Sequence, residues 1–191
     1  MKNKILKIFV IMALAVNVSY AKSNTKIDKA TFQEIDATYS KDKNGVYVWE
    51  NRGWKKLEGL DPVTFQIINI SGSARRYLKD KNGIYSIIYS MDGDSDKLVL
   101  EKLPYDPQTY EVINQLYSKD KNNIYYSDRK IIGLDLPTFQ RIDENIYSKD
   151  KNNIYFRGKK ISGADKDTFE KIDKYNYSKD KNNIYYNDKK I

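Results

Sequence analysis

The decapeptide YSKDKNNIYY, at residues 117–126, occurs again unchanged at residues 177–186. It also occurs at residues 147–156, with its last residue replaced by phenylalanine. Shorter versions, which follow the pattern Y-x-K-D-K-N-[GN]-[IV]-Y, begin at Tyr39 and Tyr77. Self-similarity at intervals of a few tens of residues is the signature of a repeat protein. The sequence therefore predicts five tandem copies of one structural unit.

A second element, D-x-x-T-[FY]-[QE]-x-I-[DN], precedes each copy of this motif. Aspartate is a favoured N-cap residue, and in the first copy Phe32 and Ile35 are three positions apart, on one face of a helix. We therefore expect a short helix of one or two turns in each unit. The element begins at Asp28, Asp61, Asp106, Asp135 and Asp165. The five units are then residues 28–60, 61–105, 106–134, 135–164 and 165–191.

The K-D-K-N segment predicts a tight hairpin, because aspartate suits the first position of a type I turn. Glycine or asparagine follows, and these two residues tolerate a positive φ best. We therefore expect a three-residue loop closed by a left-handed residue. That residue is Gly45, Gly83, Asn123, Asn153 or Asn183. A second turn and a third short strand complete each unit, and in the second unit this hairpin carries an insertion.

Units of about 30 residues are too small to fold alone without disulfides or a metal, and the chain has no cysteine. Neighbouring units should therefore stack and bury their tyrosine, phenylalanine and isoleucine side chains between them. The expected fold is mostly β, a tandem repeat of three-strand antiparallel meanders with one short helix per unit. We favour an open curved stack, because propeller blades usually need about 40 residues or more. A closed propeller-like ring is the alternative.

These hairpins resemble the bacterial DKNYY repeat family, which is named after the motif. The segment KDKNNIYY begins at Lys119 and again at Lys179, with close variants at the other three sites. The resemblance covers residues 28–191, although the first two units depart from it at the final tyrosine pair. It implies an exported or envelope protein of bacteria with no assigned activity, and it supplies no catalytic residues.

The N-terminus has the features of a secretory signal peptide. A lysine-rich start precedes an apolar run at residues 8–16, and the small residues Ser19 and Ala21 follow. The apolar run is shorter than the roughly 20 residues that a membrane-spanning helix needs. We expect residues 1–21 to be removed and residues 22–191 to form one repeat domain in the periplasm, at the cell surface or in the medium. An uncleaved anchor is the alternative, and no later segment is apolar enough to span.

The charge pattern argues against nucleic acid as a partner. The formal net charge is +8, and +5 remains when the three lysines of the signal segment are removed. The remaining lysines are spread along the chain and alternate with aspartates, whereas a nucleic-acid site needs a clustered basic patch. Pairs such as Lys41 with Asp42 could bind polyanions or divalent ions, but turn chemistry and solvated charge are the favoured interpretation. The expected partner is an unknown protein or glycan of the cell envelope.

Enzyme chemistry finds little support in the composition. The chain has no histidine and no cysteine, which excludes histidine-containing triads and cysteine nucleophiles. We therefore expect a non-enzymatic binding or scaffold module without a cofactor. The alternative is a carboxylate-dependent hydrolase of envelope polysaccharide that uses non-repeated acids such as Glu50 or Glu101.

Two stretches outside the repeat pattern are candidate sites. Asp92, Asp94 and Asp96 alternate in a way that suits calcium, but the match to a calcium loop is partial and a polar hairpin tip is favoured. Trp49 and Trp54 are non-repeated aromatic residues and so candidates for ligand contact, although pairing across their hairpin is the favoured interpretation. The repeated tyrosines are interpreted as packing ladders rather than as a ligand-stacking face.

Overall fold

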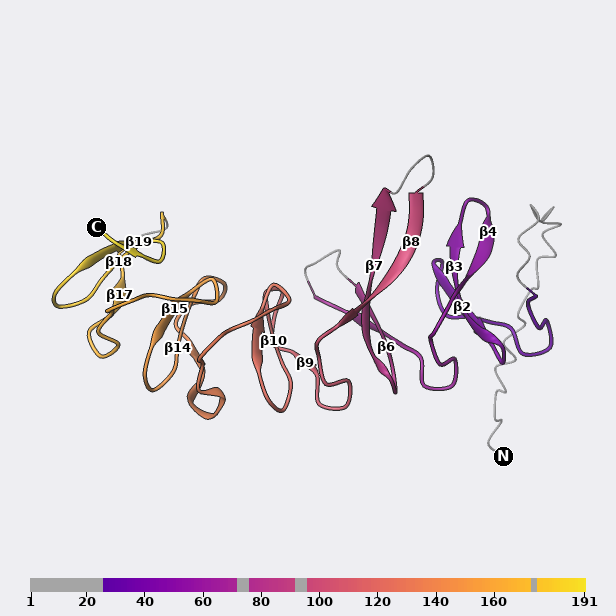
Figure 1. The fold of residues 1–191 in the computed structure, drawn as a ribbon, viewed down its shortest axis with the longest axis horizontal. Coiled ribbons are helices and arrows are strands. Elements are labelled where there is room, and N and C mark those ends of the chain that lie inside the picture. The colour runs from indigo at the N-terminus through magenta and orange to yellow at the C-terminus, as the bar shows by residue number, and fades with distance from the viewer. Residues whose placement is uncertain (1–25, 72–75, 92–95, 173–174) are drawn as a thin grey trace, which may run out of the picture. The chain divides into compact units, whose positions relative to one another are not determined.

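The computed structural model describes residues 26–71, 76–91, 96–172 and 175–191. These residues form twenty strands, arranged as five antiparallel sheets of four strands each (Figure 1). Each sheet lies within one of the five repeats, and its strands are neighbours in the order of the chain. None of these sheets closes into a barrel. The chain divides into two compact units, residues 1–56 and 57–191.

The strand bounds show how closely the repeats agree. The first repeat contains β1 (Gln33–Glu34), β2 (Tyr39–Asp42), β3 (Gly45–Glu50) and β4 (Gly53–Leu57). The second contains β5 (Gln66–Asn69), β6 (Arg76–Asp80), β7 (Gly83–Met91) and β8 (Asp96–Leu103). The third contains β9 (Glu111–Val112), β10 (Tyr117–Lys119), β11 (Ile124–Tyr126) and β12 (Arg129–Lys130). The fourth contains β13 (Gln140–Arg141), β14 (Tyr147–Lys149), β15 (Ile154–Phe156) and β16 (Lys159–Lys160). The fifth contains β17 (Glu170–Lys171), β18 (Tyr177–Lys179), β19 (Ile184–Tyr186) and β20 (Lys189–Lys190).

The prediction of one short helix per unit is wrong. In the described residues the aspartate element forms a turn. In the fourth repeat this turn is a single 3₁₀ turn, η1 (Leu136–Thr138). After the turn the chain becomes extended and adds a fourth, outer strand to each sheet, as β1 does beside β2. The reason is local, because an aspartate side chain caps the backbone N–H groups of a turn as well as those of a helix. Each repeat is thus a turn followed by four strands.

The left-handed residues also lie elsewhere than predicted. Neither Gly45 nor Asn123 nor their equivalents have a positive φ, whereas the turn after the central hairpin does. In the third repeat Ser127 and Asp128 have φ of 45° and 68°, and this two-residue loop joins β11 to β12. Positive φ at both loop residues defines a type I′ turn, whose twist matches that of the flanking strands. The same is true of Asn51–Arg52 and Arg157–Gly158.

The insertion in the second repeat lengthens this second hairpin. Strands β7 and β8 pair from Ile84 with Leu103 to Met91 with Asp96. The pairs nearest the base of this hairpin correspond to the short second hairpin of the other repeats, and the remaining pairs extend it. The inserted residues therefore leave the rest of the repeat unchanged. This agrees with the prediction that the insertion lies in the hairpin.

The hydrophobic core of residues 57–191 lies at the junctions between consecutive repeats. Tyr117 and Ile124 of the third repeat, both almost fully buried, share one cluster with Phe139 and Tyr155 of the fourth. The next junction and the preceding one repeat this arrangement. At the next junction the cluster contains Tyr147, Ile154, Phe156 and Ile161 with Phe169 and Tyr185, and at the preceding one Tyr77, Ile84 and Tyr105 with Tyr110 and Tyr125. The expected burial between neighbouring repeats is therefore confirmed in this unit.

Candidate functional site

A buried aspartate is the polar centre of every repeat. In the fourth repeat Asp150 is 3% exposed, and its Oδ1 accepts the backbone N–H groups of Asn152 and Asn153, each at 2.7 Å. Its Oδ2 accepts the backbone N–H of Asp135 at 2.8 Å and the hydroxyl of Tyr155 at 2.8 Å. The carboxylate thus ties together the hairpin turn, the start of the repeat and the third strand, β15. The equivalent residues are Asp42, Asp80, Asp120 and Asp180, all buried. The interpretation of these aspartates as turn-forming residues is confirmed, whereas their interpretation as solvated charges is wrong.

The first aspartate of each repeat joins the same two segments from the outside. Asp135 Oδ2 accepts the hydroxyl of Thr138, and that hydroxyl oxygen accepts the backbone N–H of Lys151 at 3.0 Å. The Lys151 ammonium group lies 3.0 Å from Asp135 Oδ1, with more than half of the lysine side chain exposed. The equivalent ion pairs are Asp28–Lys43, Asp61–Lys81, Asp106–Lys121 and Asp165–Lys181. The two sequence motifs are therefore the two halves of one clasp.

The pKa values follow from these contacts. Burial alone would raise the pKa of Asp120 and Asp150, but the backbone N–H and tyrosine hydroxyl donors outweigh it and lower both values. At the surface, the ammonium groups of Lys81 and Lys121 lower the pKa of Asp61 and Asp106 to about 2. All these carboxylates are therefore ionised at neutral pH.

Lowered carboxyl pKa values predict loss of stability in acid. The unfolded chain, with pKa near 3.8, takes up protons before the folded chain does, so protonation favours unfolding. The free energy of unfolding should be constant above about pH 5 and fall as the pH decreases through 3.8 towards 2. Urea unfolding at a series of pH values and constant ionic strength measures this. A midpoint that stays level or rises over that range would contradict the prediction.

Both tyrosine ladders are structural in the internal repeats. Tyr117, Tyr147 and Tyr155 are 0% exposed, and Tyr125 is 1% exposed. The Asn153 side chain donates to the Tyr155 hydroxyl at 3.3 Å, and Asn123 and Asn183 do the same for Tyr125 and Tyr185. Asparagine is thus needed there for its amide rather than for its backbone freedom. Buried rings of this kind have no free face for a ligand.

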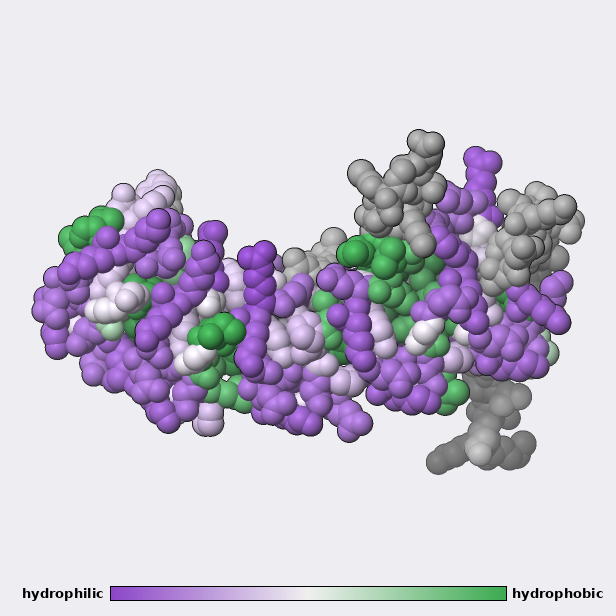
Figure 2. All heavy atoms as spheres, in the orientation of Figure 1, coloured by the Kyte–Doolittle hydropathy of each residue, from purple (hydrophilic) through white to green (hydrophobic). Residues whose placement is uncertain are grey.

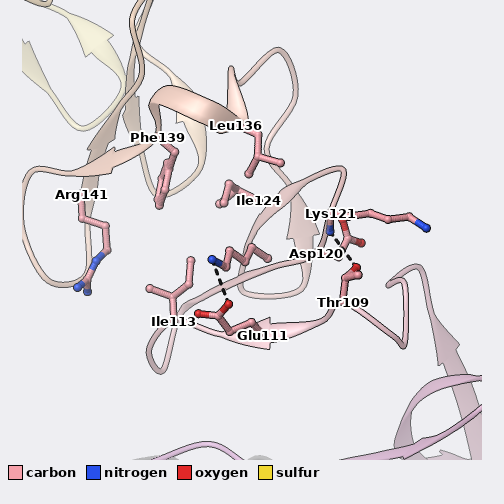
Figure 3. A pocket seen from close by; sticks show the side chains of 10 residues that line it. Thr109, Glu111, Ile113, Asp120, Lys121, Ile124, Leu136, Phe139 and Arg141 are labelled. Carbon is pink, nitrogen blue, oxygen red and sulfur yellow. Dashed lines mark hydrogen bonds and ion pairs between the residues drawn. The ribbon is translucent and has the colours of Figure 1, made fainter.

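A groove between the third and fourth repeats is the best candidate site. Its volume is about 620 Å³, within the range of ligand pockets. Figure 3 shows its lining: apolar side chains from both repeats face its centre, with charged groups around them. The apolar lining is Ile113, Ile124, Leu136 and Phe139, and the polar lining is Thr109, Glu111, Lys119, Asp120, Lys121 and Arg141.

Of the charged groups around this groove, Asp120 is buried in the clasp, whereas Glu111, Lys121 and Arg141 are exposed. The Lys119 ammonium group lies 3.0 Å from Glu111 across strands β9 and β10. Arg141, on β13, donates from Nη1 to the backbone oxygen of Glu144 at 3.4 Å and is exposed. Exposed pairs of this kind are weak, so a ligand can replace them at little cost. The groove can therefore hold an apolar or ring-shaped group while its rim makes hydrogen bonds and ion pairs.

The residues that distinguish this groove from the other junctions differ between the repeats. This variation among the repeats is the signal that the sequence analysis did not use. At the next junction Gln140 takes the place of Glu111, Lys166 that of Leu136, and Lys171 that of Arg141. Positions that vary between otherwise identical repeats are free of the common packing requirement. Comparison of the five units at those positions would have found the groove.

The tryptophans predicted as contact residues form a pair in the first repeat. The rings of Trp49 and Trp54 are 5.1 Å apart at 70°, and Trp54 also meets Phe32 edge-on at 5.7 Å. This is the cross-hairpin pair that the sequence favoured over ligand contact. Trp49 is nevertheless 40% exposed, so part of its ring remains open to a ligand.

The remaining candidates do not assemble into a site. Asp92 and Asp94 lie outside the described residues, and Asp96 begins β8. Within the described part of the chain, no group of three or more acidic side chains is placed to hold a metal ion. Glu50 is ion-paired with Lys55 at 3.2 Å, and Glu101, on another sheet, accepts from Ser86 at 3.3 Å. The predicted signal segment, residues 1–21, also lies outside the described residues. In the part that is described, no helix is long and apolar enough to cross a membrane.

The fold and its clasp define this chain as a β-repeat protein, in which a buried aspartate holds each unit together and buried aromatic and aliphatic side chains join one unit to the next. A family model of the DKNYY family matches residues 2–89 and, in a second overlapping match, residues 25–155. The chain therefore belongs to the DKNYY family. No match was found among curated proteins or among solved structures.

Proposed function

We propose that this protein is an exported, non-enzymatic repeat protein that acts as a binding or scaffold module at the bacterial envelope. The groove between the third and fourth repeats is the observation that carries the proposal. Its apolar floor and charged rim suit a protein segment or a glycan, both of which combine apolar faces with hydrogen-bonding groups. Residues 1–21 support export, because they have the pattern of a secretory signal.

The non-enzymatic part of the proposal is supported by how the repeated polar groups are used. Asp150 and Tyr155 are buried and bonded to each other and to backbone N–H groups, which leaves them unable to act on a substrate. The groove itself offers Glu111 in an ion pair and Asp120 in the buried clasp. Both carboxylates are thus engaged in contacts within the protein, whereas glycoside hydrolysis requires two carboxyl groups that flank the scissile bond.

Replacing Arg141 with glutamate should reduce binding to the cell envelope. The change reverses one exposed charge at the groove rim, and we expect about a tenfold loss of affinity, equivalent to ~1.4 kcal/mol. The full chain is mixed with an isolated envelope fraction of the host, and the sedimented fraction is measured over a range of protein concentrations.

Arg129→Glu is the matched control, because Arg129 is an exposed arginine of the third repeat outside the groove. Equal loss of binding in both variants would show general electrostatic attraction and count against the groove. No sedimentation of the wild-type chain, together with release of soluble saccharide from the envelope fraction, would favour the hydrolase alternative.

A further inference from the structure

The outer strand of the third sheet has a free edge beside the groove. Strand β9 is the last strand of its sheet and pairs with β10, with Val112 opposite Ser118. The neighbouring Ile113 donates its backbone N–H to the oxygen of Tyr117 at 2.9 Å. Because hydrogen-bonded pairs alternate along an antiparallel ladder, the N–H and C=O groups of Val112 point away from β10. Among the described residues no strand pairs with this outer side of β9, so the edge can accept a further strand.

Other edges of these sheets carry charged side chains at the corresponding places. Opposite the hairpin serine, where the third repeat has Val112, the fourth has Arg141 and the fifth has Lys171. On the far side of the sheets, β12, β16 and β20 each consist of two exposed basic residues. Long charged side chains, lysine above all, protect an edge strand against pairing with another chain. In β9 the one charged residue, Glu111, is ion-paired with Lys119, so this edge is less protected than its equivalents.

The groove lies on the side of β9 that faces the fourth repeat. Glu111 and Ile113, on either side of Val112 in the chain, both line it (Figure 3). A strand added beside β9 would direct every second side chain to the same side, because successive side chains of a strand alternate between the two faces of a sheet. The Asn114 side chain donates to the backbone oxygen of Glu144 across the junction, at 2.6 Å. The two walls are therefore held together before any ligand binds, which lowers the cost of binding.

The lining of the groove suits an apolar side chain next to an acidic one. Figure 2 shows hydrophobic side chains gathered in a few places on a largely hydrophilic face, so an apolar lining open to solvent is a local feature of this chain. The charged groups around the groove are three cations and two carboxylates: Lys119, Lys121, Arg141, Glu111 and Asp120. The Asp120 carboxylate is already taken up by hydrogen bonds within the clasp. An acidic group is therefore the complement of this site, with the exposed guanidinium group of Arg141 as its ion-pair partner.

We propose that the groove binds an extended protein segment, which adds a fifth strand to the third sheet beside β9. The segment has an apolar and an acidic residue two positions apart, so that both side chains lie on the side of the groove. This inference rests on the proposed function, because it takes the same groove as the binding site and names its occupant. Main-chain hydrogen bonds to Val112 supply affinity, and the groove selects the side chains. A glycan has no row of backbone N–H and C=O groups and would leave the edge of β9 unused.

Selection from a library of random peptides displayed on phage, with the full chain as target, tests the proposal. We expect the enriched peptides to have an apolar and an acidic residue two positions apart. The affinity of the best synthetic peptide is then measured by fluorescence anisotropy. Methylation of its backbone nitrogens, one at a time, should reduce the affinity about tenfold or more at the residue that donates to Val112, because an N-methyl group cannot donate and leaves the carbonyl unpaired.

Val112→Pro tests the same contact from the side of the protein. Proline removes the N–H group that points away from β10, and an edge strand tolerates it there because the ladder does not use that group. The peptide affinity should fall about tenfold or more. Glu34→Pro is the matched control, because Glu34 lies opposite the hairpin serine Ser40 in β1 of the first repeat, and it should bind the peptide like the wild type. Urea unfolding checks that both variants keep their fold, and the methylated peptides test the contact without changing the protein.

The proposal fails if no peptide is enriched on the wild-type chain, or if the enriched peptides bind Val112→Pro as tightly as the wild type. It also fails if methylation has no effect at any position of the peptide, because the contact would then not involve the backbone. Reversing the charge in Arg141→Glu should weaken the acidic peptides, and equal binding would contradict the assigned ion pair.

Digesting the envelope fraction with a protease before mixing separates this proposal from the proposed function. A protein segment as occupant predicts that the wild-type chain no longer sediments with the digested fraction. Sedimentation that survives digestion and still depends on Arg141 identifies an occupant other than protein, which overturns the added strand and keeps the binding module. Peptide binding that depends on Val112, together with envelope binding that Arg141→Glu leaves unchanged, keeps the added strand and overturns the envelope function.

Discussion

Replacing Asp150 with alanine should destabilise the fourth repeat by about 3–5 kcal/mol, the cost of breaking a buried charged network by removing one member. Alanine leaves three backbone N–H groups and the Tyr155 hydroxyl without the oxygen atoms that accept from them. Each buried donor that loses its acceptor costs about 1–3 kcal/mol. The total is a large part of the roughly 5–15 kcal/mol that holds a typical domain together. Denaturant unfolding followed by circular dichroism measures the loss.

Two further variants separate the network from simple loss of charge. Asp167→Ala removes an exposed carboxylate that pairs with Lys166, and it should change the free energy of unfolding by less than about 0.5 kcal/mol. Asp150→Asn keeps one acceptor oxygen but turns an amide donor towards other donors. Its cost in the free energy of unfolding should therefore lie between those of Asp167→Ala and Asp150→Ala. A loss below about 1 kcal/mol in Asp150→Ala would mean that water replaces the carboxylate, and the clasp would then not be the centre of the repeat.

The repeat motif was sufficient to predict the five units, the β class and the position of the central hairpin. It was not sufficient to predict the outer strand, because Asp28 and Thr31 cap a turn with the same hydrogen bonds that would cap a helix. The outcome is decided by a longer-range contact, in which the Thr31 hydroxyl accepts the backbone N–H of Lys43. That bond draws the turn against the hairpin and leaves the next residues extended beside β2.

The alternation of glycine and asparagine after the hairpin turn was misinterpreted for a similar reason. Both residues tolerate a positive φ, yet neither uses it here. Asn153 is explained by the Tyr155 hydroxyl that its amide reaches, and Gly83 by crowding, since a Cβ atom there would lie 2.8 Å from Lys102 Cε. Lys56 stands in the same way beside Gly45, so a side chain of the neighbouring strand favours glycine in these two repeats, and propensity alone does not contain that information.

The candidate site was the least predictable feature. The groove combines Ile113 of one repeat with Phe139 of the next, and their approach follows from stacking rather than from any local pattern. The tryptophans drew attention because they are rare, but their rings pack against each other, and that of Trp54 also packs against Phe32. Repeated residues build the fold, so sites in this chain are to be sought where the repeats differ.

Replacing Tyr147 with alanine should cost about 3–5 kcal/mol, the usual range for truncating a fully buried large aromatic side chain. The ring is 0% exposed at the junction of the fourth and fifth repeats, where it meets Phe156 and Phe169 at 5.3 and 5.5 Å. Its removal leaves a cavity and also deletes the hydrogen bond to Asn176. Because repeat proteins are stabilised mainly by contacts between neighbours, the fifth repeat should lose protection first. Hydrogen exchange resolved by peptide measures this order of unfolding.

Tyr177→Ala is the matched control, because Tyr177 occupies the same motif position in the fifth repeat but is 38% exposed. Its truncation removes less buried area and opens no enclosed cavity, so it should cost clearly less, about 1 kcal/mol on the usual scale for a partly buried side chain. The difference between the two variants isolates the contribution of the junction from that of the hairpin they share. Equal losses would mean that the tyrosine acts within its own repeat, and the stacking interface would then not be the main source of stability.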